Sequence, residues 1–290
     1  MKKIPVRRIA EKPKLTAPSQ LFKIRKVEEI LAGNDLKQDL HRHDFFFVLQ
    51  LKNGIGNHEI DFTPYLVHDH SVFFLRPGQV HRLELNAICT GYLMEFSSGF
   101  YYPKDKSSGQ RLRKASNKNY CKLEVNRFEK LRDILSLIFR EYSDRDEGYL
   151  DIIKASLEIF FIEFVRQSPN PNSVPATTGS YSQERFEEFS EHLEKHVTTH
   201  KLVSYYTGLM NLSSNQLNEI TKAAVGKTSS ELINEHIILE ARRHLLATCN
   251  QVKDIAGYLG YEDVSYFIRF FKKHTGHSPE AFRHEQGRNK

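Results

Sequence analysis

Residues 252–272 of this 290-residue chain read VKDIAGYLGYEDVSYFIRFFK. A short apolar segment leads to a turn at Gly260, and Asp263 can cap a second segment whose apolar residues recur every three or four positions. This order predicts two short helices joined by a tight turn. In a helix-turn-helix unit the second helix enters the major groove of DNA and the first helix supports it.

A second stretch has the same plan. Residues 203–222 read VSYYTGLMNLSSNQLNEITK, in which Ser213 or Ser214 can cap the second helix. Polar residues on one helix usually form only a solvated face. Two segments with matched turns and caps favour a double DNA-reading unit over that alternative.

The helix predicted at 263–274 has two distinct sides. The inward side is predicted to carry Tyr266, Phe267, Phe270 and Phe271, and the outward side Val264, Ser265, Ile268, Arg269 and Lys272. Arginine pairs with guanine O6 and N7, serine with either base type, and aliphatic side chains with the thymine methyl. The outward side therefore predicts base contacts.

The helix predicted at 213–224 has a comparable outer face. Leu217 and Ile220 are predicted to point inward, which leaves Asn215, Gln216, Asn218, Glu219 and Lys222 outside. Asn and Gln pair with adenine, Glu can accept from cytosine N4, and Lys suits phosphate.

The whole region after residue 182 is predicted to be helical. The expected helices are 183–197, 201–210, 213–224, 229–248, 252–259, 263–274 and 279–284, with Gly226, Gly260 and Gly276 as stops. No strand pattern occurs there.

This region resembles the DNA-binding domain of the AraC/XylS family of bacterial regulators. The residues that carry the resemblance are Ile237–Leu246, Ile255-Ala256, Leu259-Gly260-Tyr261, Ser265-Tyr266-Phe267, Arg269–Lys273, Gly276, Ser278-Pro279 and Phe282-Arg283. The resemblance implies that both second helices enter successive major grooves. It also implies base-facing positions for Asn215, Asn218, Glu219, Val264, Ser265 and Arg269. The predicted DNA-binding set adds Gln216, Lys222, Lys272 and Lys273. The first unit departs from the family pattern at Thr207-Gly208, where an alanine-containing helix contact is usual.

The N-terminal half is predicted to be a β domain followed by two helices. Short runs at Phe45–Leu51, Ile60–Phe62, Ser71–Leu75 and Gly91–Phe96 alternate with turn signals, which is typical of a barrel or sandwich. Helical periodicity follows from Val125 to about Tyr142 and from Leu150 to Phe164. These two helices could complete the domain core or form a dimer interface.

Two motifs in this half, His41-Arg42-His43-Asp44-Phe45 and Arg76-Pro77-Gly78-Gln79-Val80-His81, resemble the strand motifs of the cupin barrel. A barrel of this kind serves as the sensor domain in the same regulator family. The resemblance implies a small-molecule effector inside the barrel, with His41, His43 and His81 as its candidate contacts.

The same three histidines raise an alternative, a metal-dependent cupin enzyme. Cupin enzymes hold a metal with three histidines and a carboxylate. Phe47 stands where the carboxylate is expected. The missing carboxylate argues against an oxygenase site, although three histidines alone could still bind zinc. The predicted sites include no catalytic residue, no metal and no cofactor, and the chain is expected not to be an enzyme. A protein-interaction module without a DNA role is a third reading, which leaves Arg269 and Lys272 without a purpose.

Charge and composition agree with this assignment. The net charge is +6, but it is concentrated in residues 1–26, and residues 183–290 carry equal numbers of basic and acidic residues. Five of those acids lie in the helix predicted at 183–197, so basic residues prevail beyond it. Three distant cysteines suit a reducing compartment, and no apolar run could span a membrane. We expect a cytoplasmic protein.

The sequence thus predicts an α+β multidomain chain. It has a basic arm (1–20), a cupin-like β-barrel with two dimerisation helices (21–167), a Pro- and Ser-rich linker (168–182), and an all-α domain with two helix-turn-helix units (183–290). The arm is expected to be a solvated tail, and the basic run at Arg111, Arg113, Lys114, Lys118 and Lys122 an exposed loop. The expected partners are double-stranded DNA, a small-molecule effector, a second copy of the chain and RNA polymerase.

Overall fold

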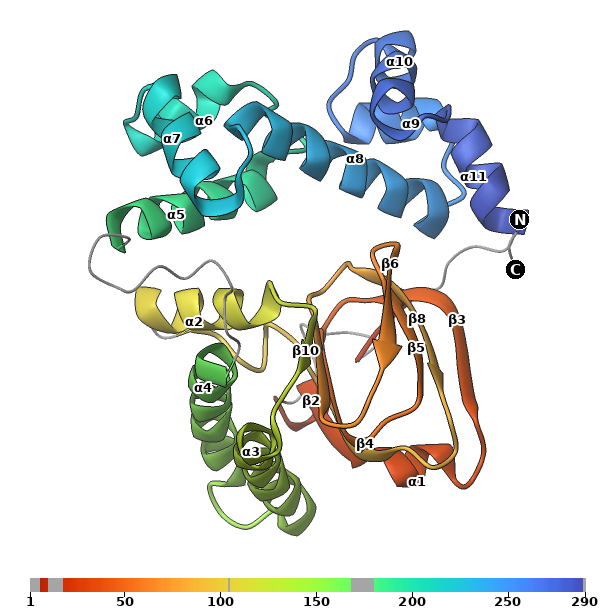
Figure 1. Ribbon diagram of the computed structural model, residues 1–290, viewed down its shortest axis with the longest axis vertical. Helices are drawn as coiled ribbons and strands as arrows, with labels where there is room; N and C mark the ends of the chain where they lie inside the picture. Colours follow the sequence, from red (N-terminus) through yellow and green to blue (C-terminus); the bar gives the residue numbers. More distant parts are fainter. Residues whose placement is uncertain (1–5, 10–17, 104, 168–179, 289–290) are drawn as a thin grey trace. The chain divides into compact units, whose positions relative to one another are not determined.

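The computed structural model describes residues 6–9, 18–103, 105–167 and 180–288 (Figure 1). The chain divides into two compact units, one within Ile4–Asn170 and the other within Pro171–Lys290. The first is rich in strands and the second is helical. The predicted order of a β-rich domain followed by an all-α domain is confirmed. Most of the predicted linker, residues 168–179, lies outside the described residues.

The first unit contains two five-stranded sheets, with orders β1-β3-β8-β5-β6 and β10-β7-β4-β9-β2. The strands are β1 (Val6–Arg7), β2 (Phe22–Lys26), β3 (Leu36–His43), β4 (Phe46–Asn53), β5 (Gly56–Ile60), β6 (Thr63–Val67), β7 (Ser71–Leu75), β8 (Val80–Leu85), β9 (Thr90–Phe96) and β10 (Tyr120–Lys122). The Phe47 ring on β4 lies 5.2 Å from the His81 ring on β8, between ring centres, so the inner faces of the sheets meet. Among the described strands no pairing joins the two sheets into one closed barrel.

One predicted strand is a turn. Ile60 pairs with Thr63, and the two residues between them, Asp61 and Phe62, have φ values of 46° and 69°. Two consecutive left-handed residues form the tight connection that suits the twist of a hairpin. The prediction of a strand at Ile60–Phe62 was wrong because left-handed backbone is rare for phenylalanine and the sequence has no glycine to mark it.

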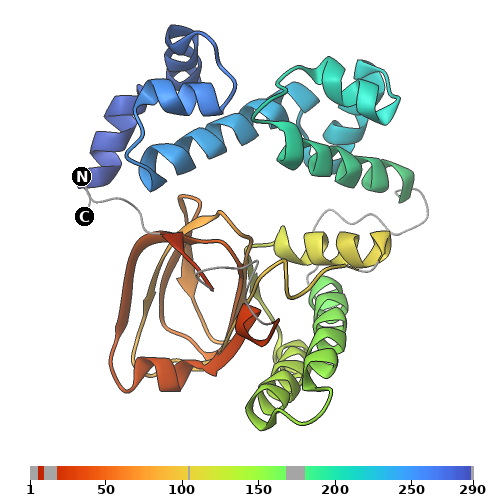
Figure 2. The same ribbon diagram turned by 180° about the vertical axis from the view of Figure 1, so that it is seen from behind.

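The two long helices of this unit complete its core. They are α3 (Val125–Asp144) and α4 (Tyr149–Gln167), close to the predicted ranges. Phe161 of α4 lies 5.9 Å from Phe74 of β7 and 6.1 Å from Phe96 of β9, between ring centres. Figures 1 and 2 show both helices beside the sheet that contains β10. Core packing is therefore established for these helices, and a dimer role stays a prediction.

Two segments expected to be irregular are ordered. The helix α2 (Lys106–Ser116) carries Arg111, Arg113 and Lys114, and its own apolar contribution to the core is only Leu112 and Ala115. Part of the predicted arm belongs to the sheets, because β1 pairs in parallel with β3 at Arg42 and His43. Short elements complete the N-terminal part: the 3-10 turn η2 (Pro18–Leu21) and the helix α1 (Val27–Leu31).

The second unit is a set of helices arranged around one long helix. They are α5 (Ser180–His196), α6 (Val203–Met210), α7 (Ser214–Val225), α8 (Ser229–Ala247), α9 (Val252–Tyr258), α10 (Val264–Thr275) and α11 (Pro279–Arg288). Gly226 and Gly276 end α7 and α10 in left-handed conformation, at φ 73° and 82°. Glycine adopts this conformation without a Cβ clash. The predicted helices and stops are confirmed to within a few residues.

The helix α8 connects two groups of helices, α5–α7 and α9–α11 (Figures 1 and 2). Its buried Ile233 and Ile237 pack with Phe189, Tyr206 and Leu217 of the first group. Toward its C-terminal end Ala241 and Leu245 are also buried, alongside contacts with α9 and α11. One helix thus supplies core residues to both groups.

Candidate functional site

The two helix-turn-helix units, α6–α7 and α9–α10, share their turn geometry. In the first turn Asn211 has φ 52°, and the Leu212 N–H donates to the Thr207 carbonyl at 3.0 Å. In the second turn Gly260 has φ 68°, and the Tyr261 N–H donates to the Ala256 carbonyl at 2.8 Å. In each turn a left-handed residue is followed by an N–H that donates to the carbonyl five residues earlier. This arrangement ends a helix and reverses the chain.

The second helix of each unit begins at the predicted cap. The Ser213 hydroxyl accepts from the Gln216 N–H at 3.2 Å, and the Asp263 carboxylate accepts from the Ser265 N–H at 2.8 Å. These side chains satisfy N–H groups that the helix itself leaves without partners. Asp263 is thereby confirmed as the cap of α10, and Ser213 rather than Ser214 caps α7.

The outer face of α10 carries most of the predicted contacts. Ser265, Arg269, Lys272 and Lys273 are exposed, Ile268 is 36% exposed, and Val264 is half-buried. The Arg269 guanidinium lies 3.7 Å from the Asp263 carboxylate, and both side chains are more than 60% exposed. An ion pair this exposed is weak. The Arg269 side chain can therefore leave Asp263 for a base.

Tyr266 lies on the outer face of α10 and not in the predicted inward stripe. Its side chain is 56% exposed, whereas Phe267 and Phe271 are completely buried. The apolar stripe is centred on those two residues, and Tyr266 is one step around the helix from Phe267. The sequence alone did not separate four neighbouring aromatic residues into those two sets. Tyr266 thus joins the exposed surface beside Ser265 and Arg269.

The outer face of α7 carries four of the five predicted residues fully on the surface. Asn215, Gln216, Glu219 and Lys222 are exposed. Gln216 uses its Oε1 atom to accept from the Ser213 N–H at 2.9 Å. Asn218 is half-buried, and its Oδ1 atom accepts from the N–H and the hydroxyl of Ser229, the first residue of α8, at 2.9 and 2.7 Å.

These bonds compete with the base contacts expected of Gln216 and Asn218, which stay a prediction. Bidentate pairing with adenine needs both atoms of the amide group. In each residue the amide oxygen already serves a helix N-terminus. Such a tertiary cap depends on where α8 begins in space, so spacing along the sequence does not reveal it for Asn218.

Within the helical unit, the loop between α5 and α6 contacts the turn of the second helix-turn-helix unit. The Lys201 ammonium donates to the Gly260 carbonyl at 2.8 Å and lies 4.6 Å from the centre of the Tyr261 ring. Burial lowers the pKa of Lys201 from its ordinary value. The contact fixes the second turn against the first group of helices, in addition to the link through α8.

Arg283 closes the C-terminal end of α8. Its side chain is buried and donates to the Leu245 carbonyl at 2.9 Å and the Asn250 carbonyl at 2.7 Å. The Leu245 carbonyl lies in the last turn of α8, where a helix end leaves acceptors without partners, and the Asn250 carbonyl lies in the loop that follows. Arg283, one of the residues that carry the family resemblance, has a structural role here.

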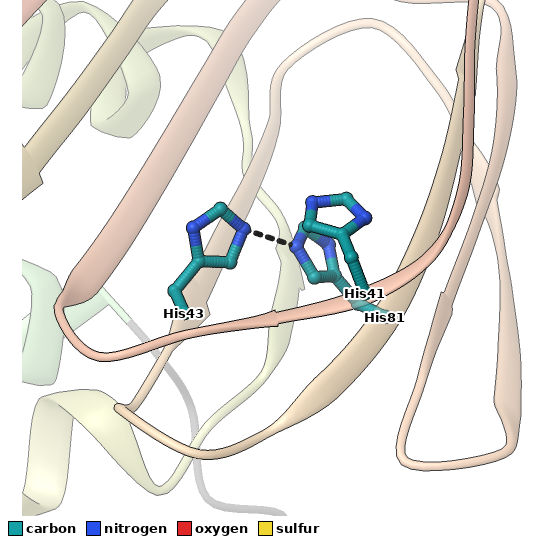
Figure 3. Close-up of side chains that lie close together, drawn as sticks. All are labelled: His41, His43 and His81. Carbon is teal, nitrogen blue, oxygen red and sulfur yellow. Dashed lines mark hydrogen bonds between the residues drawn. The ribbon is translucent and has the colours of Figure 1, made fainter. Parts of the chain in front are cut away.

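The predicted effector contacts lie in the strand-rich unit. His41, His43 and His81 lie together there, between the two sheets (Figure 3). His41 and His43 point to the same side of β3, and His41 faces His81 across the β3–β8 pair. All three side chains are almost completely buried, at 0%, 4% and 0% exposure. The Nε2 atoms of His43 and His81 are 2.6 Å apart.

A fourth histidine, His58 on β5, belongs to the same group. Its Nε2 atom lies 2.8 Å from Nδ1 of His81, and its side chain is completely buried. Sequence reasoning missed it, because His58 joins the others only through the pairing register of β5 and β8. The buried histidine cluster is defined here as His41, His43, His58 and His81.

Burial keeps this cluster uncharged at neutral pH. It lowers the pKa of His41 to about 4 and those of His43 and His58 to about 3. It also holds the pKa of His81 well below its ordinary value. The positive charge of Arg7 on β1 acts in the same direction on His41, His43 and His81.

Comparison with known proteins agrees with the double unit. A family model described as a helix-turn-helix domain matches residues 206–285. The chain is 24% identical over 258 residues to the HTH-type transcriptional activator RhaS of Pectobacterium carotovorum, covering 84% of this chain and 87% of the relative. It is 25% identical over 254 residues to RhaS of Klebsiella pneumoniae, covering 86% and 88%.

Solved structures also match the chain. ToxT from Vibrio cholerae O395 is 16% identical and covers 91% of this chain and 97% of its own, with a TM-score of 0.43. The C-terminal domain of the response regulator yesN from Fusobacterium nucleatum is 28% identical and covers 34% of this chain and 98% of its own, with a TM-score of 0.33.

The two capped units and these relatives define a DNA-binding transcriptional regulator. Residues 206–285 are a helix-turn-helix domain, and over most of its length the chain is similar to RhaS activators, which are regulators of the AraC family. Within the described residues no helix has both the length and the apolar composition needed to cross a membrane.

Proposed function

We propose that both units of one chain read DNA together, with α7 and α10 in successive major grooves. The observation that carries this proposal is the pair of matched turns and caps, each followed by a helix with an exposed polar face. Eight residues of the predicted DNA-binding set are proposed to contact DNA: Asn215, Glu219, Lys222, Val264, Ser265, Arg269, Lys272 and Lys273. Gln216 and Asn218 are proposed as supports of the helix termini, and Tyr266 is added as an exposed neighbour.

The chemistry of the two faces differs. Three basic side chains, Arg269, Lys272 and Lys273, lie exposed on α10, whereas α7 exposes Lys222 together with the acidic Glu219. Phosphate contacts supply much of the affinity of a DNA-binding protein and base contacts supply its specificity. We therefore expect the α9–α10 unit to contribute more affinity, and Glu219 to favour cytosine at one position of the other block.

The strand-rich unit is proposed to sense a small molecule between its two sheets. A buried group of neutral imidazoles offers both hydrogen-bond donors and acceptors, so a polar effector could replace the contacts between the rings. Such an effector changes DNA binding only if it favours one arrangement of the molecule over another. The regulator is proposed to act as a homodimer in the cytoplasm, with RNA polymerase as a partner, and without catalytic activity.

The experiment is selection of bound duplexes from a random DNA pool by the purified full chain at near-physiological salt. We expect enrichment of two base blocks about one helical turn apart, 10–10.5 base pairs between centres. The same selection with Arg269→Ala should keep the first block and lose one base preference in the second. Recovery of random duplexes, with binding that only declines as salt rises, would contradict sequence reading by either unit.

A further inference from the structure

The hydrogen bonds of the buried histidine cluster define which ring nitrogens are engaged. Nδ1 of His41 lies 2.7 Å from the Asp39 carbonyl oxygen. A carbonyl can only accept, so this nitrogen carries the proton and Nε2 of His41 carries a lone pair. In the part of the chain that the structure describes, no group bonds to that Nε2 atom, although it is fully buried.

The other three histidines form a row, His43–His81–His58, joined by the 2.6 Å and 2.8 Å contacts. A neutral imidazole has one N–H and one lone pair. Whichever direction the protons take along the row, one terminal ring keeps a buried N–H and the other a buried lone pair. Those terminal atoms are Nδ1 of His43 and Nδ1 of His58, and both lack a partner among the described residues. Hydrogen bonds within the row therefore do not satisfy the cluster.

We propose that His41, His43 and His81 bind one divalent transition-metal ion, such as Zn²⁺, and that His58 is a positioning residue for His81. One ring nitrogen from each of the three rings lies within 4.8 Å of the other two. Metal–nitrogen bonds of about 2.0–2.1 Å place tetrahedral ligand atoms about 3.4 Å apart. The contact between His43 and His81 must open by less than an ångström and the wider separations must close, which small ring rotations achieve.

The contacts around two of the three rings, His41 and His81, match this role. A histidine that binds metal through one nitrogen usually donates the other N–H to a carbonyl or a similar acceptor, which fixes the ring. The Asp39 carbonyl does this for His41. Nε2 of His58 does it for His81, because it can accept from Nδ1 and leave Nε2 of His81 for the metal. Phe45 and Phe47 lie against the His43 ring at 4.3 and 5.4 Å between ring centres and give that ring apolar neighbours.

The donor set indicates the class of metal. Three imidazole nitrogens without a carboxylate suit zinc, nickel, copper or iron, and they suit magnesium or calcium poorly. Three protein ligands leave the fourth position of a tetrahedral ion for water or for a donor atom of the proposed effector. With a metal bound, the effector would contact the ion and would not replace the contacts between the rings. The metal proposal concerns only the strand-rich unit. Its success or failure is therefore independent of DNA reading by the helical unit.

The test uses the full chain after treatment with a chelator. Co²⁺ serves as the probe because tetrahedral cobalt absorbs visible light strongly, and Zn²⁺ is added to displace it. We expect one Co²⁺ per chain, with displacement by one Zn²⁺. Binding should be lost in His43→Gln and in His81→Gln. His58→Gln should keep the stoichiometry and weaken the affinity by about 10–100-fold.

The matched control is His68→Gln, because His68 is an exposed histidine in the same unit. It should bind Co²⁺ as the parent does. If the ligand variants fail to fold, nitrogen-15 NMR of the parent chain decides, since Zn²⁺ should give the shifts of metal-bound nitrogen to one ring nitrogen each of His41, His43 and His81 and not to those of His58. Absence of saturable one-to-one binding, or unchanged binding in both ligand variants, would overturn the proposal.

Discussion

Arg269 is the exposed side chain of α10 best suited to identify a base pair. Its nearest charged neighbour, Asp263, is 3.7 Å away and exposed, so release of the guanidinium requires little energy. We predict that Arg269→Ala reduces specific affinity by about 1–3 kcal/mol and relaxes the preference at one base pair. Quantitative binding to the selected duplex and to its single-base variants measures both effects.

Lys222→Ala tests a phosphate contact, for comparison with the base contact tested by Arg269→Ala. Lys222 is exposed on α7 and is assigned to phosphate. Its loss should weaken binding to all duplexes alike and lower the salt slope by about one. If Arg269→Ala gave this same uniform loss, Arg269 would not read a base.

Asn218 and Asn215 separate a structural role from a reading role on the same helix. Asn218→Ala removes both bonds to Ser229, whose side chain is completely buried. We predict that it lowers the free energy of unfolding of the second unit by about 1–3 kcal/mol. Asn215→Ala should change stability by less than about 0.5 kcal/mol because the side chain is exposed.

Urea unfolding of both variants, followed by helix signal, measures the difference. The Asn215 variant should instead lose sequence preference in the first block. Equal stability of the two variants would show that the cap formed by Asn218 does not hold α8.

At the scale of elements, the turn between α9 and α10 depends on Gly260. Its φ of 68° is left-handed, and an added Cβ would lie 2.6 Å from the Thr198 carbonyl oxygen and 2.7 Å from the Lys201 ammonium. We predict that Gly260→Ala destabilises the second unit by more than about 1 kcal/mol. The strain should also disturb the contact of Lys201 with this turn.

Gly257, inside α9, is the matched control. An added Cβ would meet nothing within 4 Å there. Because alanine favours a helix over glycine, Gly257→Ala should stabilise the unit by about 0.4–1 kcal/mol. Thermal unfolding of the two variants should therefore shift in opposite directions. A shift in the same direction would contradict the conformation assigned to the turn.

The elements of the second unit could be predicted closely from the sequence because local chemistry marks their ends. Ser213 and Asp263 cap helices, and Gly226 and Gly276 end them, each through contacts within a few residues. The helix α2 could not be found this way, since its few apolar residues give a weak pattern. The turn at Asp61-Phe62 places a phenylalanine in left-handed backbone, which is rare for that residue.

The sites were less predictable than the elements. The faces of α7 and α10 follow from helical periodicity, which placed Arg269 and Lys222 correctly on the surface. The contacts of Asn218 with Ser229 and of His58 with His81 join separate elements. They depend on packing and strand register, which no local pattern specifies.

At the scale of the whole molecule, the two units should respond differently to acid. His58 has a pKa of about 3 in the folded chain, against an ordinary value of 6.5. Between about pH 6.5 and pH 3 its ring is therefore protonated in the unfolded chain and neutral in the folded chain. Its contribution to stability is therefore complete at neutral pH and declines as the pH falls from about 6.5 toward 3. At pH 5 the loss is about 2 kcal/mol for His58 alone.

Calorimetry of the full chain with a chelator present, at pH 7 and pH 5, measures this difference. We predict that the transition of the strand-rich unit moves to lower temperature at pH 5 by more than that of the helical unit. The other members of the buried histidine cluster act in the same direction, because burial lowers their pKa values too. A transition of the strand-rich unit that does not depend on pH would contradict the burial of these neutral rings.

The central proposal for the whole molecule is that both helix-turn-helix units of one chain read one face of the DNA. The most direct measurement is the affinity of the full chain for a selected two-block duplex and for the same duplex with about half a helical turn inserted between the blocks. We predict that the insertion reduces affinity by more than about tenfold, to the level of a duplex with a single block, because α8 and the Lys201–Gly260 contact fix the units relative to each other. Equal affinity for both spacings would contradict joint reading by the two units.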